Sequence, residues 1–211
     1  MVSRLITVLS LGIHNAVVYG RQVPTKRELL IEAAARVLAE EGQSAVSARR
    51  MAAEVGASTM AVYTHVGSMD ELLTAVHTEG FVRFHRRLSA VRRSDEPLAD
   101  LYGLGVAYRR FARAEPHLYQ AMFGRTLADA ALTTEQTEQA LSTFAILRDA
   151  VARAVDAGQL AGDPEVAASQ IWVTVHGFVS LELAGLLFDP RPAQAYDALL
   201  TTLVVGLAGQ R

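Results

Sequence analysis

Hydrophobic residues recur every three to four positions over most of this chain, which is the spacing that places them on one face of an α-helix. Glycine, proline and capping residues divide the pattern into segments of uneven length. Near the start the segments are short, and they predict helices beginning near residues 25, 47, 58 and 68. No segment of convincing length alternates as a β-strand would, so the sequence predicts an all-α fold. The later predicted helices cover residues 98–114, 116–123, 134–157, 164–188 and 193–208.

The short segments begin and end with recognisable helix signals. The sequence TKRE (residues 25–28) is a capping box, in which a hydroxyl and a carboxylate satisfy free backbone amides at a helix start, and SMDE (residues 68–71) is a second one. Ser47 and Ser58 are candidate N-caps, and Gly56 between their helices can adopt a left-handed backbone conformation at little cost. We therefore expect two very short helices joined by a tight turn.

Two such helices are typical of a helix–turn–helix motif, in which a brace helix supports a reader helix whose start meets the base edges of DNA. In the brace helix (residues 47–55) three apolar residues are predicted to face inward. In the reader helix (residues 58–66) Val62 and Val66 lie four apart and should bury one face. The residues left toward solvent or DNA are Thr59, Met60, Tyr63, Thr64 and His65.

The chemistry of these positions fits a DNA duplex. Ser47 and Ser58 can present hydroxyls and helix-start amides to phosphate, and Arg49 adds positive charge on the brace helix. Tyr63 and His65 can reach phosphate oxygens, while the other reader positions can touch base edges or thymine methyl groups. The alternative is that all of these are ordinary exposed residues of a small helical bundle. The predicted DNA-binding residues are Ser47, Arg49, Ser58, Thr59, Met60, Tyr63, Thr64 and His65.

Charge is distributed unevenly along the 211 residues. The formal net charge is only −2, yet residues 1–93 carry 12 Lys and Arg against 8 Asp and Glu, whereas residues 94–211 carry 8 against 14. A basic front and an acidic rear indicate two roles, the first of them near phosphate. The chain has no cysteine, which excludes disulfides, thiolate zinc sites and cysteine nucleophiles and fits a reducing cytoplasm.

We expect three regions along the chain. Residues 23–90 form a helix–turn–helix DNA-binding domain of three helices with a fourth helix as its link, and residues 91–211 form a helical ligand-binding and dimerisation domain. Residues 1–22 contain a short apolar run after one Arg, but no small-residue cleavage site follows as in a signal peptide. We interpret them as an N-terminal extension, either disordered or an overcalled start, with synthesis beginning at Val23.

The segment QIWVTVHGFVSLELAGLLF (residues 170–188) is apolar almost all round, so it should be covered on more than one face. His176 and Glu182 within it argue against a membrane span. Together with residues 193–208 it would supply two helices per chain to a four-helix dimer interface. Glu182 needs a partner in such a helix, either an Arg of a second subunit or a group in a pocket, and the sequence leaves both open.

Trp172 and His176 lie four residues apart and share one helix face, where they predict the wall of a ligand pocket. The indole would stack on a ligand, and the imidazole would offer it a hydrogen bond. Ordinary core filling is the alternative for every candidate of this kind. The predicted ligand-binding residues are Tyr108, Phe111, Tyr119, Phe123, Trp172 and His176, with Met122, Phe144 and Leu147 as further candidates.

Residues 25–85 resemble the N-terminal domain of the tetracycline-repressor family of one-component regulators. The resemblance rests on AEEG, MAAEVGAS, AVYTHV and SMDELL, which occur in the family's order and spacing. Two positions depart from the family pattern: Val66 replaces the usual Phe, and Met69 replaces a Lys that contacts phosphate, so we do not expect that contact here. The sequences WVTVHG and EPHLYQAMFG resemble a C-terminal subclass known by its Trp-His-Gly (WHG) signature.

The resemblance implies a ligand-responsive, DNA-binding transcriptional regulator of the cytoplasm. It implies a homodimeric repressor that a small effector releases from double-stranded operator DNA, with no cofactor, no metal, no membrane partner and no enzymatic activity. An apolar pocket would favour a lipophilic effector. Two other functions stay open. An effector-less architectural DNA binder would have a filled core in place of a cavity, and a helical hydrolase would depend on His176 and Glu182, because the chain has no catalytic or metal-binding motif.

Overall fold

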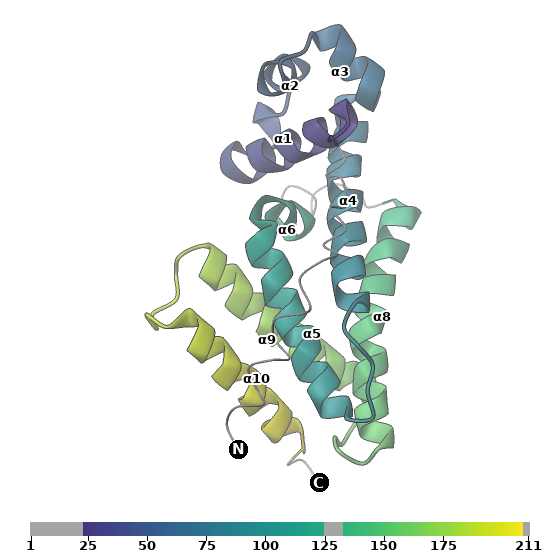
Figure 1. Ribbon diagram of the computed structural model, residues 1–211, viewed down its shortest axis with the longest axis vertical. Helices are drawn as coiled ribbons and strands as arrows, with labels where there is room; N and C mark the ends of the chain where they lie inside the picture. Colours follow the sequence, from purple (N-terminus) through teal and green to yellow (C-terminus); the bar gives the residue numbers. More distant parts are fainter. Residues whose placement is uncertain (1–22, 125–132, 209–211) are drawn as a thin grey trace, which may run out of the picture.

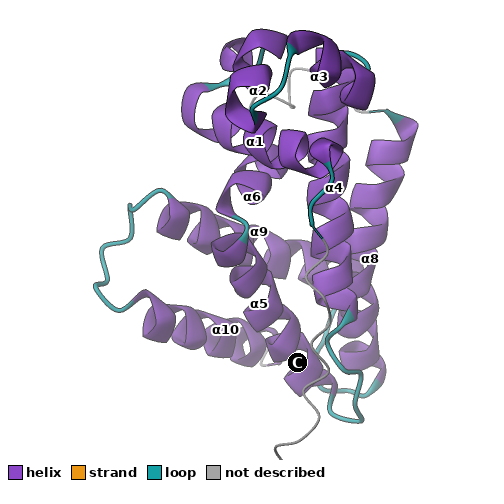
Figure 2. Ribbon diagram, turned by 45° about the horizontal axis from the view of Figure 1, so that its top comes forward, coloured by secondary structure: helices purple, strands orange, loops and turns teal. Residues whose placement is uncertain are grey.

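The computed structural model describes residues 23–124 and 133–208 of the chain. Within these ranges all regular elements are helical, which confirms the all-α prediction, and most helices are joined by short loops (Figure 2). The interpretation of residues 1–22 falls outside the described residues. No helix in the described ranges is long and apolar enough to cross a membrane.

Four helices form the front of the molecule. They are α1 (Lys26–Glu41), α2 (Ala48–Val55), α3 (Thr59–Val66) and α4 (Met69–Ser89). A single 3-10 turn (Gln43–Ala45), which the sequence pattern did not indicate, precedes α2. Figure 1 shows α1 to α3 gathered at one end of the molecule, with α4 running from them into a larger helical body.

The larger body contains the remaining helices. They are α5 (Pro97–Ala114), α6 (Pro116–Phe123), α8 (Thr134–Asp156), α9 (Pro164–Leu183) and α10 (Pro192–Ala208). Apart from the end of α9, the predicted bounds of these helices agree with the structure to within about one residue.

The helix predicted over residues 164–188 is wrong at its end, because α9 stops at Leu183. The backbone N–H groups of Gly185 and Leu186 turn back to the carbonyls of Glu182 and Leu181, at 3.1 and 2.9 Å, and Gly185 has a φ of 70°. A glycine in this left-handed conformation ends a helix. The apolar run continues past this stop into the exposed loop before α10, so hydrophobicity alone gave no sign of the helix end.

The predicted helix starts are confirmed by their cap hydrogen bonds. The N–H of Thr25 donates to the Glu28 carboxylate at 2.7 Å, and the N–H of Glu28 donates to the Thr25 hydroxyl at 3.2 Å. Ser68 and Glu71 make the same exchange at 2.8 and 3.1 Å. Gly56 ends α2 with φ 60° and ψ 48°, the left-handed conformation that the tight turn requires.

Buried side chains form two separate hydrophobic cores. The front core contains residues of α1, α2, α3 and the first turns of α4, and the rear core contains the rest of α4 with α5, α8, α9 and α10. The short helix α6 contributes Leu118 and Ala121 to the front core and Tyr119 and Met122 to the rear core. The division of the chain at residue 90 stays a prediction, since α6 belongs to both cores.

Glu182, whose partner the sequence left open, pairs with Arg109 of α5 in the same chain. Two guanidinium nitrogens of Arg109 donate to the two carboxylate oxygens at 2.7 and 2.6 Å. The side chains are only 13 % and 11 % exposed, so the pair is largely shielded from solvent. This two-point ion pair fixes α9 against α5.

We predict that Glu182→Ala lowers the free energy of unfolding by about 2 kcal/mol, because Arg109 would be left charged and largely buried without its partner. Denaturant unfolding followed by circular dichroism at fixed protein concentration measures the change. Arg148→Ala is the matched control, since its ion pair with Asp149 is exposed at 3.3 Å and its loss should change stability by less than about 0.5 kcal/mol. Equal effects of the two substitutions would contradict a structural role for the Arg109–Glu182 pair.

Candidate nucleic-acid interface and ligand cavity

One side of α3 is buried and the other faces solvent. Val62 and Val66 are buried in the front core, as predicted from their spacing. The structure therefore brings the predicted reader residues together on one exposed surface. These residues are Thr59, Met60, Tyr63, Thr64 and His65.

Ser47 and Ser58 occupy the N-caps of the brace and reader helices. The Ser47 hydroxyl accepts a hydrogen bond from the N–H of Arg50 at 3.3 Å, and the Ser58 hydroxyl accepts one from the N–H of Ala61 at 3.1 Å. Both serines are exposed. Each therefore lies at a helix N-terminus, where unpaired backbone amides and the helix dipole favour an anion.

Ion pairs neutralise one of the two brace arginines. Arg50 donates to both oxygens of Glu41, at 2.6 and 3.0 Å, and to Glu54 at 2.7 Å. Hydrogen bonds from Arg50, and then from Arg36 of α1, lower the pKa of the Glu54 carboxyl. Arg49 is exposed and forms no ion pair with any residue in the described ranges, so it is the brace arginine whose charge stays available to phosphate.

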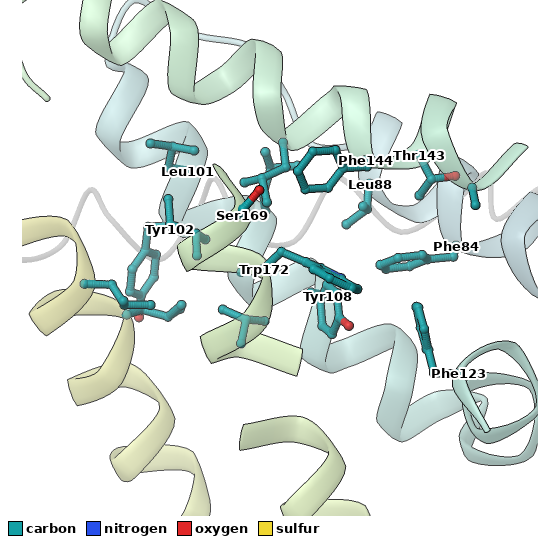
Figure 3. Close-up of a pocket in the computed structure, with 18 of the residues that line it drawn as sticks. Phe84, Leu88, Leu101, Tyr102, Tyr108, Phe123, Thr143, Phe144, Ser169 and Trp172 are labelled. Carbon is teal, nitrogen blue, oxygen red and sulfur yellow. The ribbon is translucent and has the colours of Figure 1, made fainter. Parts of the chain in front are cut away.

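A cavity of about 380 Å³ lies among α4, α5, α6, α8, α9 and α10. None of the described residues that line it is charged, and most are aliphatic or aromatic. Figure 3 shows Phe84, Tyr108 and Trp172 directed into this space. A largely apolar cavity of this volume is typical of a small-molecule site.

Only some of the predicted ligand-binding residues reach the cavity wall. Phe111 does not, because its side chain is buried in the rear core. Tyr119 and His176 also do not line the cavity, and they lie behind Tyr108 instead. Contact with a ligand stays a prediction for all six residues. The predicted residues on the wall are Tyr108, Phe123 and Trp172, joined by the further candidates Phe144 and Leu147.

The sequence analysis missed wall residues on five helices, and on two of them, α4 and α10, it predicted no ligand-binding residue. The apolar positions of these two helices have the same helical spacing as core positions. No signal in the sequence separates a cavity wall from a filled core, since the difference lies in how the helices are placed. The missed residues on these helices are Phe81, Phe84, Leu88, Leu200, Leu203 and Val204.

Behind the cavity wall, Tyr108, Tyr119 and His176 form a triangle of hydrogen bonds. The two hydroxyls lie 3.0 Å apart, and they lie 3.0 and 2.9 Å from the imidazole Nδ1. Burial lowers the pKa of His176 and raises the pKa of Tyr119 to about 12. A neutral imidazole can accept one phenol hydrogen at Nδ1, while the second phenol donates to the first. The triangle joins α5, α6 and α9.

The described residues contain no group of three His, Asp or Glu side chains that could hold a metal ion. The arrangement instead combines an exposed reader helix with an apolar cavity. Two family profiles match these two parts of the chain. The profile described as bacterial regulatory proteins of the tetR family matches residues 30–76, and the profile described as the tetracyclin repressor-like C-terminal domain matches residues 101–206, which is half of the chain.

The chain belongs to the tetracycline-repressor family. Members of this family are DNA-binding transcriptional regulators, so the helix–turn–helix identified from α2 and α3 is the family's DNA-binding motif. An uncharacterised HTH-type transcriptional regulator of Mycobacterium tuberculosis is 27 % identical over 192 residues, which cover 90 % of this chain and 83 % of that protein.

Solved structures share the fold over most of their length. A protein of unknown function from Rhodococcus sp. RHA1 is 26 % identical, with a TM-score of 0.75 over 90 % of this chain and 99 % of that one. The TetR family regulator PfmR of Thermus thermophilus is 20 % identical, with a TM-score of 0.71 over 84 % of this chain and 98 % of PfmR. AibR, in complex with isovaleryl coenzyme A and operator DNA, is 19 % identical, with a TM-score of 0.70 over 85 % of this chain and 98 % of AibR. At 20 % and 19 % identity, the similarities to PfmR and AibR show a shared fold and nothing more.

The lowered pKa of His176 leads to a prediction about pH. In the unfolded chain this imidazole takes up a proton near its ordinary pKa of 6.5, whereas in the fold burial delays protonation to lower pH. The free energy of unfolding is therefore fully retained above pH 6.5 and decreases as the pH falls below 6.5. We predict that unfolding midpoints in urea fall from pH 7.5 to pH 5.5 in the wild type and fall less in His176→Gln. Leu186→Gln, at an exposed position after α9 that does not titrate, should keep the wild-type slope. A His176→Gln protein with an undiminished slope would contradict this role of burial.

Proposed function

We propose that this tetracycline-repressor family member is a cytoplasmic, homodimeric repressor that binds operator DNA through α3 and is released by a small, lipophilic effector. The observation that carries the proposal is that the exposed reader surface and the apolar cavity are joined by two helices, α4 and α6, each of which is buried in both cores. We also retain the resemblance to the WHG subclass as part of this proposal, because Trp172 and His176 lie at the cavity and directly behind it.

The proposed DNA contacts follow from the front of the molecule. Ser47 and Ser58 cap their helices as acceptors, so each hydroxyl hydrogen can still donate to a phosphate oxygen. Arg49 adds a charge on the brace helix that no described residue pairs with. Tyr63 and His65, exposed on α3, are proposed to reach the sugar–phosphate backbone on either side of the groove. AibR has the same fold, and its structure includes operator DNA.

An exposed apolar face on α9 and α10 supports the proposed homodimer. Val166, Val173 and Leu181 are exposed at intervals of seven and eight residues, which places them on one face of α9. A Cβ atom added to Gly177 on this helix would meet nothing within 4 Å, so the helix surface is open at that point. Val205 of α10 is also exposed. Two helices from each chain would bury these faces in a four-helix interface.

The cavity supports a lipophilic effector. A charged ligand group would be desolvated among its aliphatic and aromatic wall residues without an opposite charge to pair with. Three of the four hydroxyls on the described part of the wall already have partners: Tyr102 bonds to Asp197, Tyr108 to the triangle and Thr143 to the Gln139 carbonyl, which leaves the Ser169 hydroxyl for a ligand. The binding energy would therefore come mainly from apolar burial.

The route from cavity to DNA runs through α6. Tyr108 on the cavity wall bonds to Tyr119 of α6, and the neighbouring residue Leu118 is buried in the front core. A ligand that displaces Tyr108 would shift α6 against α1 and change the spacing of two reader helices in a dimer. Such coupling requires only that the ligand favour one arrangement by about 1–3 kcal/mol.

The two alternative functions have less support. A cavity of about 380 Å³ in the rear body disfavours an architectural DNA binder without an effector. A hydrolase would need His176 and Glu182 to act together, yet Nδ1 of His176 lies against two phenols and the Glu182 carboxylate is bonded to Arg109.

We predict that Tyr63→Ala combined with His65→Ala weakens operator binding by about tenfold or more, since two phosphate contacts would be lost in each half-site. The affinity is measured by fluorescence anisotropy with an operator that the wild-type protein has selected. Circular dichroism and sedimentation should show an unchanged fold and an unchanged dimer. Full-strength binding by a folded, dimeric double variant would exclude these residues from the interface.

We predict that the wild-type protein binds a neutral apolar fluorophore such as N-phenyl-1-naphthylamine in the cavity and that Ala140→Phe weakens this binding by about tenfold, because a ring would fill part of the volume. Fluorescence titration gives both affinities. Ala99→Phe, at an exposed position of α5, is the matched control and should bind like the wild type. Equal binding by both variants would show that the fluorophore sits elsewhere.

A further inference from the structure

The reader surface lacks the side chains that recognise purines through paired hydrogen bonds. Guanine is read most often by Arg or Lys, and adenine by Asn or Gln. The sequence of α3 is TMAVYTHV, which contains none of these four residue types. If α3 enters the major groove as proposed above, most of its discrimination between bases must come from another kind of contact.

The most exposed side chain suited to such a contact is Met60. It is 75 % exposed although its side chain is apolar. It lies two residues after the N-cap Ser58, close to the helix start, which is the part of a reader helix that meets base edges. An unbranched thioether is flexible and polarisable, so it adapts to an uneven apolar surface.

Thr64 extends the same apolar surface. Its hydroxyl donates to the Met60 carbonyl at 2.9 Å, so this donor is already used within the helix. Residues four apart share one helix face, and the Thr64 methyl group therefore lies on the same side as the Met60 thioether. Two neighbouring reader positions thus offer apolar groups to the groove.

The major groove presents one apolar group, the C5-methyl of thymine. We propose that Met60, with the Thr64 methyl group beside it, reads a thymine methyl in each operator half-site and is the main determinant of sequence specificity on α3. The inference rests on the proposed DNA-binding function. Burying one methyl group gives a preference of about fourfold for each half-site, and about fifteenfold for a symmetric pair.

The experiment uses the full-length protein and an operator that it has selected from random duplexes. Each thymine of the half-site is replaced in turn by deoxyuridine, which keeps the same hydrogen-bonding groups and removes only the methyl. For the wild type we expect one position at which uracil weakens binding by about fourfold in one half-site and about fifteenfold in both. Met60→Ala should bind the thymine and uracil operators equally, and Met60→Leu, which keeps an apolar side chain, should retain part of the preference.

A change in binding by the Met60 variants reports on DNA contact and not on folding, because Met60 is exposed and its substitution leaves both cores intact. Circular dichroism of each variant checks the fold. The inference is overturned if uracil is tolerated at every thymine, if the selected half-site has no thymine, or if Met60→Ala keeps the wild-type preference for thymine. Failure to select any duplex would instead overturn the DNA-binding function itself, and this inference with it.

Discussion

The two hydrophobic cores cannot move independently, because α4 and α6 are buried in both. On α4, Leu72 and Val76 belong to the front core, while Phe81 and Phe84 belong to the rear core. Protein interiors are close-packed, so a shift of such a helix in one core must be accommodated in the other. The proposed control of the DNA-binding surface by a ligand in the cavity depends on this mechanical constraint.

The coupling between the two cores is most direct at α6, which has only eight residues. Leu118 and Tyr119 are adjacent in sequence and are buried in different cores, and the same is true of Ala121 and Met122. A Cβ atom on Gly80 of α4 would lie 2.5 Å from Met122 Cγ, so α4 and α6 approach closely at this point. A small displacement of α6 therefore reaches α1 and α4 together.

Polar contacts hold the same junction. Arg83 of α4 bonds to Glu32 of α1 at 2.6 Å, to Glu79 at 2.7 Å, and to Glu115 between α5 and α6 at 3.4 Å. Within α6, the Tyr119 hydroxyl joins the triangle with Tyr108 and the imidazole behind the cavity wall. The N-cap of this short helix is therefore tied by an ion pair to α4, which also pairs with α1, and its interior is tied by hydrogen bonds to the residues behind the cavity.

Local signals made the front of the molecule predictable from sequence. The capping boxes, the two serine N-caps and Gly56 each act over four residues or fewer, so the helix–turn–helix could be drawn before its packing was known. The remaining features depend on contacts between distant segments. The Arg109–Glu182 pair spans 73 residues, and the cavity wall uses apolar residues of six helices that look in sequence like ordinary core.

The central claim is that a dimer presents two α3 helices to DNA in a fixed geometry. Sequencing of the duplexes that the purified protein selects from a random pool tests this claim most directly. Two readers related by a twofold axis predict an inverted repeat whose half-site centres lie about 10 base pairs apart, or a multiple of one helical turn. A pool without enrichment, or one enriched for a single asymmetric element, would contradict it.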